Sequence, residues 1–222
     1  VPAAEREGYQ VVYSLDIPVS GNYRSAPPPY SVDLSANWNE PFDRVAYYLT
    51  LKKPDADPVF IFVSGDAFER RLSRIAIPRN NWMYAGPLSN MTIITNDPNI
   101  EEGSNLVGHL EFWNSNYGAR NTLDIEGASN DVYDFGDQKS GGANGYGSFQ
   151  IHHPATRQVL FAYNRFNSGV SDLGIGNNTV ERSGVIHTDW THRSNSNEYE
   201  IRHLDILVRP GEPTIPLRET IV

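Results

Sequence analysis

The stretch GYGSFQIHHPATRQVLFAYNRF, residues 145–166, decides the fold class predicted for this chain. Apolar and polar residues alternate on both sides of residues 154–156, which is the pattern of two antiparallel strands joined by a tight turn. With a three-residue turn there, Ile151 faces Val159 and Phe149 faces Phe161 on one apolar side. The stretch therefore predicts a β-hairpin with one face in a hydrophobic core.

The same alternation recurs along the chain, with turn-forming residues between the runs. In residues 43–51 it places Val45, Tyr47 and Leu49 on the core side. The best helical window, residues 66–74, is short and is limited by Pro78. The predicted strands are residues 9–16, 43–51, 59–64, 91–95, 106–113, 132–136, 146–152, 157–165, 171–176 and 198–209. Closely spaced strands without long helices predict an all-β fold, an antiparallel β-sandwich of the jelly-roll kind.

The last predicted strand contains a phase slip. Leu204, Ile206 and Val208 alternate regularly, but Ile201 is out of phase with them. A β-bulge near Arg202 and His203 would absorb the slip and would re-aim His203.

Length and composition restrict the organisation and the partners. The chain has 222 residues, enough for one sandwich over residues 1–209, followed by a proline-rich tail or linker, residues 210–222, that hints at a larger multidomain protein or assembly. The net charge of -9 and the lack of a basic stripe argue against nucleic acid, and no run of apolar residues suits membrane insertion. Cysteine is absent, and the chain begins Val1-Pro2, which fits a mature secreted protein. We expect an extracellular or periplasmic location.

The polar side of the 145–166 hairpin carries candidate chemistry. Abstraction of a proton beside a uronate carboxylate needs a group that neutralises the carboxylate, a base and an acid. Gln150, His152 and Tyr146 offer these three groups, so one hypothesis is a polysaccharide lyase acting by β-elimination. A histidine that is simply hydrogen-bonded on a sheet is the alternative.

A second candidate site combines flat aromatic rings with carboxylate and amide groups, which is what pyranose recognition uses. In residues 109–118, alternation places His109, Glu111 and Trp113 on one strand face, with Tyr117 nearby. Burial of Trp113 in the core is the alternative. The complete set of predicted glycan-binding residues is His109, Glu111, Trp113, Tyr117, Tyr146, Gln150, His152 and Asn164.

Metal binding is a third possibility. Asp131, Asp134 and Asp137 lie in a glycine-rich segment whose oxygens could hold a structural Ca²⁺, although solvated turn carboxylates would look the same. His187, Asp189 and His192 could bind zinc or act as a general base, but no spacing singles them out as a site. We therefore expect no cofactor other than a possible calcium ion.

Four segments carry a resemblance to a known family. LEFWNSNYG at residues 110–118, YDFGD at 133–137, YGSFQIH at 146–152 and DLGIGN at 172–177 resemble an accessory domain of large secreted bacterial carbohydrate-active proteins, including sialate O-acetylesterases. The resemblance extends over residues 43–209 and implies a β-sandwich attached to glycan-processing enzymes. The fragment Gln150-Ile151-His152 also resembles the Q-I-H element of jelly-roll alginate lyases, whose R-x-E-x-R and Y-F-K-A-G strands this chain lacks.

These observations predict a carbohydrate-binding module for an extracellular polysaccharide or glycan. The enzymatic alternative is the uronate lyase. The third alternative is a structural or assembly protein of an envelope or extracellular fibre, joined through sheet edges and the tail.

Overall fold

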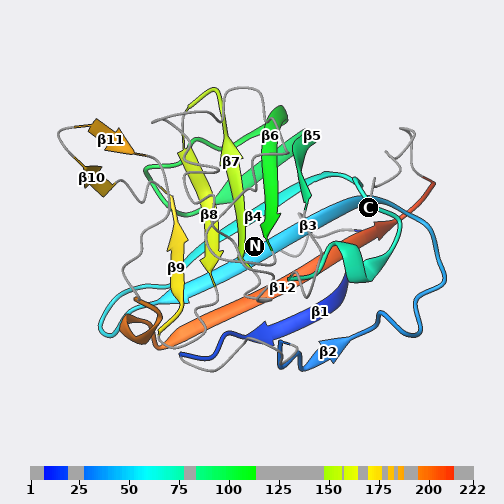
Figure 1. The fold of residues 1–222 in the computed structure, drawn as a ribbon, viewed down its shortest axis with the longest axis horizontal. Helices are drawn as coiled ribbons and strands as arrows, with labels where there is room; N and C mark the ends of the chain where they lie inside the picture. Colours follow the sequence, from blue (N-terminus) through cyan, green and yellow to red (C-terminus); the bar gives the residue numbers. More distant parts are fainter. Residues whose placement is uncertain are drawn as a thin grey trace.

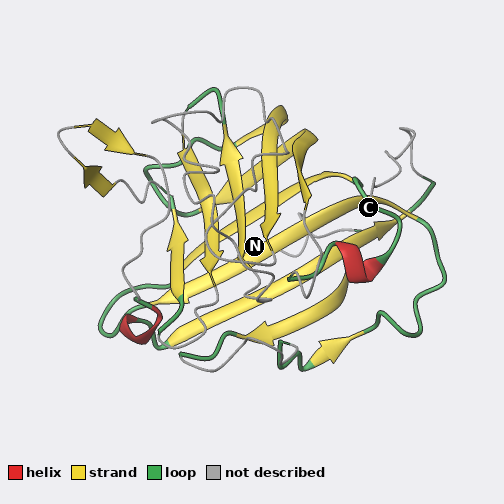
Figure 2. Cartoon of the chain, in the orientation of Figure 1, coloured by secondary structure: helices red, strands yellow, loops and turns green. Residues whose placement is uncertain are grey.

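The computed structural model describes residues 8–19, 28–77, 84–113, 148–156, 158–164, 170–176, 180–182, 185–187 and 195–212. These residues form an all-β fold with two short 3₁₀ helices (Figure 2), so the predicted class is confirmed. The strands are β1 (Gln10–Asp16), β2 (Val32–Asp33), β3 (Phe42–Lys52), β4 (Val59–Asp66), β5 (Tyr84–Thr95), β6 (Gly103–Trp113), β7 (Ser148–His153), β8 (Gln158–Asn164), β9 (Asp172–Ile175), β10 (Val180–Arg182), β11 (Val185–His187) and β12 (Ile201–Pro210). The helices are η2 (Leu72–Arg74) and η3 (Ser196–Glu198).

Ten of these strands belong to one continuous antiparallel sheet in the order β2-β1-β12-β3-β4-β5-β6-β7-β8-β9. The sheet curls: β1, β12 and β3 run diagonally in Figure 1, whereas β6 to β9 stand nearly upright and cross them. Strands β3 to β9 are neighbours in chain order, and only β12 is inserted, between β1 and β3. The finer expectation of a β-sandwich of the jelly-roll kind is therefore not confirmed. The strands β10 and β11 form a separate hairpin.

Strand β5 connects the two halves of the curled sheet. Its last residues pair with β4, and most of its length pairs with β6, with register shifts on both sides of Met91. Asn90, at the first of these irregularities, has a positive φ of 49°, which asparagine tolerates better than most residues. Bulges bend a strand and increase its twist, so this irregularity lets β5 leave one half of the sheet and enter the other.

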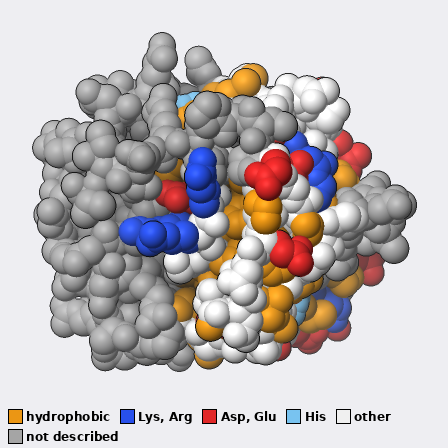
Figure 3. Space-filling view, turned by 90° about the vertical axis from the view of Figure 1, so that its right-hand side faces the viewer, with side chains coloured by type: hydrophobic (Ala, Val, Ile, Leu, Met, Phe, Trp, Pro, Cys, Tyr) orange, Lys and Arg blue, Asp and Glu red, His pale blue; other side chains and the backbone are white. Residues whose placement is uncertain are grey.

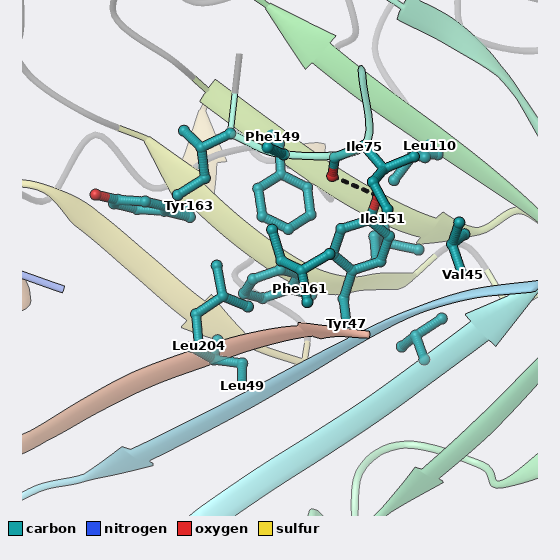
Figure 4. Packing of buried hydrophobic residues seen from close by; sticks show 14 of the residues in the cluster. Val45, Tyr47, Leu49, Ile75, Leu110, Phe149, Ile151, Phe161, Tyr163 and Leu204 are labelled. Atoms are coloured by element: carbon teal, nitrogen blue, oxygen red, sulfur yellow. Dashed lines mark hydrogen bonds between the residues drawn. The ribbon is translucent and has the colours of Figure 1, made fainter. Parts of the chain in front are cut away.

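The core lies between the two halves (Figure 4). Tyr47 of β3 is 1% exposed, and its ring centroid lies 5.1 Å from that of Phe149 on β7 and 6.2 Å from that of Phe112 on β6. Its hydroxyl donates a 2.9 Å hydrogen bond to the carbonyl of Ile75, which follows η2. Desolvation by burial raises the pKa of the Tyr47 hydroxyl well above its usual value. This aromatic contact holds the diagonal and upright strands together.

The outer edge of β9 is covered by a side chain. The amide of Asn195 accepts from the Leu173 N–H at 2.8 Å and donates to the Leu173 carbonyl at 2.9 Å. Ser196 N–H donates to the carbonyl of Ser171, and Ser196 Oγ donates to the carbonyl of Val19 after β1. Because unpaired strand edges invite association with other chains, this cap protects the end of the sheet.

The predicted strands match closely. Nine of the ten overlap observed strands, and the tenth, residues 132–136, lies outside the described residues. The alternation in β3 is also confirmed, since Val45, Tyr47 and Leu49 are at most 1% exposed in the core. The helical window contains only the three-residue η2, and the short strands β2, β10 and β11 were not predicted.

Two details of register were wrong. Strand β12 pairs with β3 without interruption from Ile201 to Arg209, so no bulge occurs at Arg202 and His203. Instead, Ile201 is simply an exposed apolar residue, 40% accessible. In the β7–β8 hairpin Ile151 pairs with Phe161 and His152 with Val159, because the register shifts between Ile151 and His152.

That irregularity explains the wrong pairing in the hairpin. Phe149 pairs with Tyr163, two residues away from the predicted partner. The shift sends Leu160 into the main core and leaves Val159 in a separate small cluster with Ala162. The predicted faces for Phe149 and Gln150 nevertheless hold, because the slip interrupts the alternation of β8, where the adjacent Leu160 and Phe161 both lie in the main core, and not that of β7.

No helix in the described part of the chain is long and apolar enough to cross a membrane. Figure 3 shows the end of the molecule at the right of Figure 1, where hydrophobic, acidic and basic side chains alternate over short distances in the coloured region.

Candidate functional site

The structure brings three of the predicted site residues together on one face of β6 and β7. His109 pairs with His152, and two positions along, Glu111 pairs with Gln150. His152 Nε2 donates a 2.8 Å hydrogen bond to Gln150 Oε1. Both side chains are 1% exposed, whereas His109 is half-buried. The predicted polar stripe is therefore a buried hydrogen-bonded pair and not an open surface.

Burial decides the protonation of this pair. Desolvation, followed by the neighbouring His109, lowers the pKa of His152 well below its usual value. His152 is consequently neutral at pH 7, and its Nε2 carries the proton that Gln150 accepts. A neutral imidazole beside a neutral amide provides the groups that proton abstraction needs. A substrate could use them only by reaching side chains that are 1% exposed.

The other predicted residues are described only in part. Trp113 lies at the end of β6 opposite Ser148, and Asn164 ends β8. Tyr117, Tyr146 and the proposed calcium ligands Asp131, Asp134 and Asp137 lie outside the described residues, as do two of the zinc candidates, Asp189 and His192. Among the side chains that the structure describes, no group of three potential metal ligands is found.

A second polar group, which the sequence did not predict, lies on the outer face of β1 and β12. His203 Nδ1 is 2.6 Å from Asp16 Oδ1, and His203 Nε2 is 3.1 Å from Asp205 Oδ1. Ser14 Oγ donates to the same Asp205 oxygen at 2.8 Å and is 3.3 Å from His203 Nε2. The Asp16 side chain is 91% exposed, and that of His203 is 34% exposed. This group therefore faces solvent.

The order Ser14, His203, Asp16 has the connectivity of a nucleophile, base and orienting acid. Its electrostatics oppose that role. The hydrogen bond to Asp205, together with Asp16, raises the pKa of His203 to about 9. A base must be unprotonated to accept the serine proton, and Ser14 already donates to Asp205. At neutral pH the group is an imidazolium held between two carboxylates.

The pairing of β1, β12, β3 and β4 extends this polar group into an aromatic surface. Across these strands Asp16 pairs with His203, His203 with Thr50, and Thr50 with Phe60. We call these four residues the outer-face row. The next row begins with Ser14 and Asp205 and continues to Tyr48, whose ring centroid lies 6.0 Å from that of Phe60. The outer-face row is thus charged at one end and aromatic at the other.

The aromatic end rests on a small apolar layer that is separate from the main core. Phe62, Ala46 and Leu207 are buried in this layer, and Tyr9 and Tyr48 pack against it partly exposed. The rings of Tyr9 and Phe62 meet edge to face at 5.6 Å. Tyr48 therefore packs on this layer and Phe60 packs on Tyr48, and both side chains stay partly exposed.

Residue spacing offered one signal for the polar group formed by Ser14, Asp16, His203 and Asp205. Ser14 and Asp16, and likewise His203 and Asp205, are two positions apart, so each pair shares one side of its strand. Nothing in the sequence shows that strand 9–16 pairs with strand 198–209.

Comparison with known proteins adds no assignment: no family model, curated protein or solved structure matches this chain.

Proposed function

We propose that this domain is a non-catalytic glycan-binding module whose binding surface is the outer-face row with Tyr48. The observation that carries the proposal is the in-register sequence Asp16, His203, Thr50, Phe60, which places exposed hydrogen-bonding groups beside aromatic rings. Sugars stack their C–H faces on aromatic rings and hydrogen-bond through hydroxyl groups at the rim. The resemblance to accessory domains of secreted carbohydrate-active proteins supports the same function and an extracellular or periplasmic setting.

The dimensions suit a short oligosaccharide. Asp16 and Phe60 are separated by three strand spacings, about 14 Å at 4.8 Å each. Asp16 is fixed by His203, and Phe60 is fixed by its contact with Tyr48, so little conformational entropy is lost on binding.

The charges favour a neutral glycan over an anionic one. The cations near the outer-face row already have carboxylate partners: Lys52 lies 2.7 Å from Glu200, and Lys53 lies 2.7 Å from Glu198. His203 is shared by two aspartates. With a chain charge of -9, a polyuronate would meet net repulsion.

The test is co-elution of the protein with neutral, acidic and sulfated polysaccharides in size-exclusion chromatography. We expect the protein to move to the position of a neutral polymer whose size is unchanged. Phe60→Ala should weaken binding about tenfold, the upper range for one aromatic contact.

The matched control is Val107→Ala, which trims a side chain 62% exposed on β6, away from the outer-face row. This variant should bind like wild type. Equal loss in both variants, or no loss in Phe60→Ala, would contradict the proposed surface.

The second candidate is β-elimination on a uronate polymer, and the observation that favours it is the contact between neutral His152 and Gln150. It predicts shorter polymer chains and unsaturated products that absorb ultraviolet light. His152→Ala would then abolish turnover and leave co-elution intact, whereas a polymer of constant size excludes this candidate for the polymers assayed.

A further inference from the structure

Trp38 presents a partly exposed indole ring on the loop between β2 and β3. The ring packs against the main core, as do Tyr30 and Leu34. Its Nε1–H donates a 2.6 Å hydrogen bond to the carbonyl of Glu40 in the same loop. Because apolar contacts and its own N–H hold the indole, its orientation is fixed before any ligand arrives.

The loop that carries Trp38 is braced by its own hydrogen bonds. Asp33 Oδ1 accepts from the Ser35 N–H at 2.9 Å and from Ser35 Oγ at 2.6 Å, which is an Asx turn. The N–H groups of Asn37 and Trp38 both donate to the carbonyl of Leu34, at 3.0 and 2.9 Å. The loop therefore needs little ordering when it binds a ligand.

Polar side chains flank the indole ring. Asn37 precedes Trp38, Asn39 and Glu40 follow it, and all three of these polar residues are exposed. A pyranose stacks its C–H face on an aromatic ring, and its hydroxyl groups bond to amide and carboxylate groups at the rim. An anionic sugar would be repelled by the Glu40 carboxylate. The loop thus has the groups that a neutral sugar needs.

Trp38 is well separated from the outer-face row. It packs against the main core, whereas the outer-face row lies on the opposite face of the same sheet. The Trp38 loop reaches the far end of β12, where the Gly211 N–H donates to the carbonyl of Pro41 (Figure 1). From His203 to that end, at Pro210, β12 extends about 23 Å at 3.3 Å per residue. One sugar ring cannot contact both places.

We propose that Trp38 forms a second sugar-binding subsite, which takes one neutral pyranose residue with the help of Asn37 and Asn39. The proposal rests on the glycan-binding function inferred above and adds a second point of attachment to it. Because the two places lie on opposite faces of the sheet, one protein molecule can hold two polysaccharide chains and cross-link them.

The test is an NMR titration of isotopically labelled protein with cellohexaose, xylohexaose, mannohexaose and N-acetylchitohexaose. The indole N–H signal of Trp38, identified by its loss in Trp38→Phe, should shift with at least one of these oligosaccharides, together with the side-chain amides of Asn37 and Asn39. Asn39→Ala should weaken binding at this subsite about threefold to tenfold, the range for one hydrogen bond.

The same titration separates this proposal from the outer-face row. If every oligosaccharide that moves Thr50 and Phe60 leaves the Trp38 signal unmoved, the second subsite is overturned and the outer-face row stands. Movement at Trp38 alone supports the subsite and overturns the outer-face row. Signals unmoved at both places overturn both.

Cross-linking gives a second readout. Light scattering should rise when the wild-type protein is mixed with the neutral polymer that corresponds to the bound oligosaccharide, and it should stay at baseline for Trp38→Ala. Trp38→Phe keeps an aromatic ring and should retain part of the scattering. No rise for the wild type would overturn the two-site account.

The matched control is Tyr199→Ala. Tyr199 is also a partly buried aromatic residue packed against the main core, but it precedes β12, and Lys53 Nζ lies 5.3 Å from its ring centroid. Its variant should scatter light like wild type. A loss equal to that of Trp38→Ala would show that Trp38 acts only through packing and would overturn the subsite.

Discussion

His152 and His203 lie on strands of the same sheet, yet their pKa values move in opposite directions. His152 is buried beside another histidine and a neutral amide, so desolvation lowers its pKa. His203 is part-exposed between two carboxylates, so hydrogen bonding raises its pKa to about 9. The comparison shows that the charge partner and the access of water, and not the strand environment as such, decide what a histidine can do here.

A substitution in the buried Gln150–His152 pair should lower the free energy of unfolding more than one in the exposed group around His203. Gln150→Ala removes the acceptor of the buried His152 N–H and leaves a cavity, so the free energy of unfolding should fall by about 3 kcal/mol. Urea denaturation followed by tryptophan fluorescence measures this change. A loss no larger than that of Ser14→Ala would mean that the contact contributes little.

The protonation of His203, between Asp16 and Asp205, should control the stability of the protein at alkaline pH. The pKa of His203 is raised from 6.5 to about 9, so the stabilisation that its proton provides is complete below pH 6.5 and is lost as the pH rises toward 9. Discounted for solvent screening of a side chain 34% exposed, this loss is about 1 kcal/mol. His203→Gln should show a flatter stability profile over this range. An unchanged profile would show that His203 does not remain protonated.

His152 should have the opposite effect and reduce the stability of the fold at acidic pH. Its pKa is lowered, so the unfolded chain binds a proton that the folded chain excludes, and stability should fall as the pH drops below 6.5. Ring-carbon chemical shifts of the six histidines, followed by NMR from pH 5 to 10, should show His152 remaining neutral below pH 6.5 and His203 titrating near 9. Similar titration midpoints for His152 and His203 would contradict the opposite pKa shifts of the two histidines.

Ser14→Ala should cost about 1 kcal/mol, because one hydrogen bond to Asp205 is lost and the carboxylate keeps His203 as a partner. Thermal unfolding measures the shift. A loss of 3 kcal/mol or more would indicate that the hydrogen bonds among Ser14, Asp16, His203 and Asp205 are strongly cooperative.

The smallest effect should come from Asp16. The largest cause of the raised His203 pKa is the hydrogen bond to Asp205, and Asp16 is 91% exposed. Asp16→Asn should therefore lower the pKa of His203 less than Asp205→Asn does, as NMR titration of the two variants would show. The reverse order would contradict this ranking.

Much of the fold could be predicted because alternation is a local signal. The core side of β3 follows from Val45, Tyr47 and Leu49 in the sequence alone. The β7–β8 register could not be predicted, because one irregularity between Ile151 and His152 shifts the pairing and interrupts the alternation of β8 at Leu160.

The sites show the same division between local and long-range information. Gln150 and His152 could be placed on one face because they are two residues apart. Their burial was missed, since it depends on the whole fold. The outer-face row was missed because Asp16 and His203 are 187 positions apart and meet only through the pairing of β1 with β12.

The most direct measurement is a chemical-shift map of the protein titrated with a short oligosaccharide from the neutral polymer that it binds. If the outer-face row is the binding surface, the largest changes fall on Asp16, Thr50, Phe60 and His203. The amides of Gln150 and His152 then stay within experimental error. Changes concentrated on β6 and β7, with Thr50 and Phe60 unmoved, would contradict the proposed surface and make the buried pair the site.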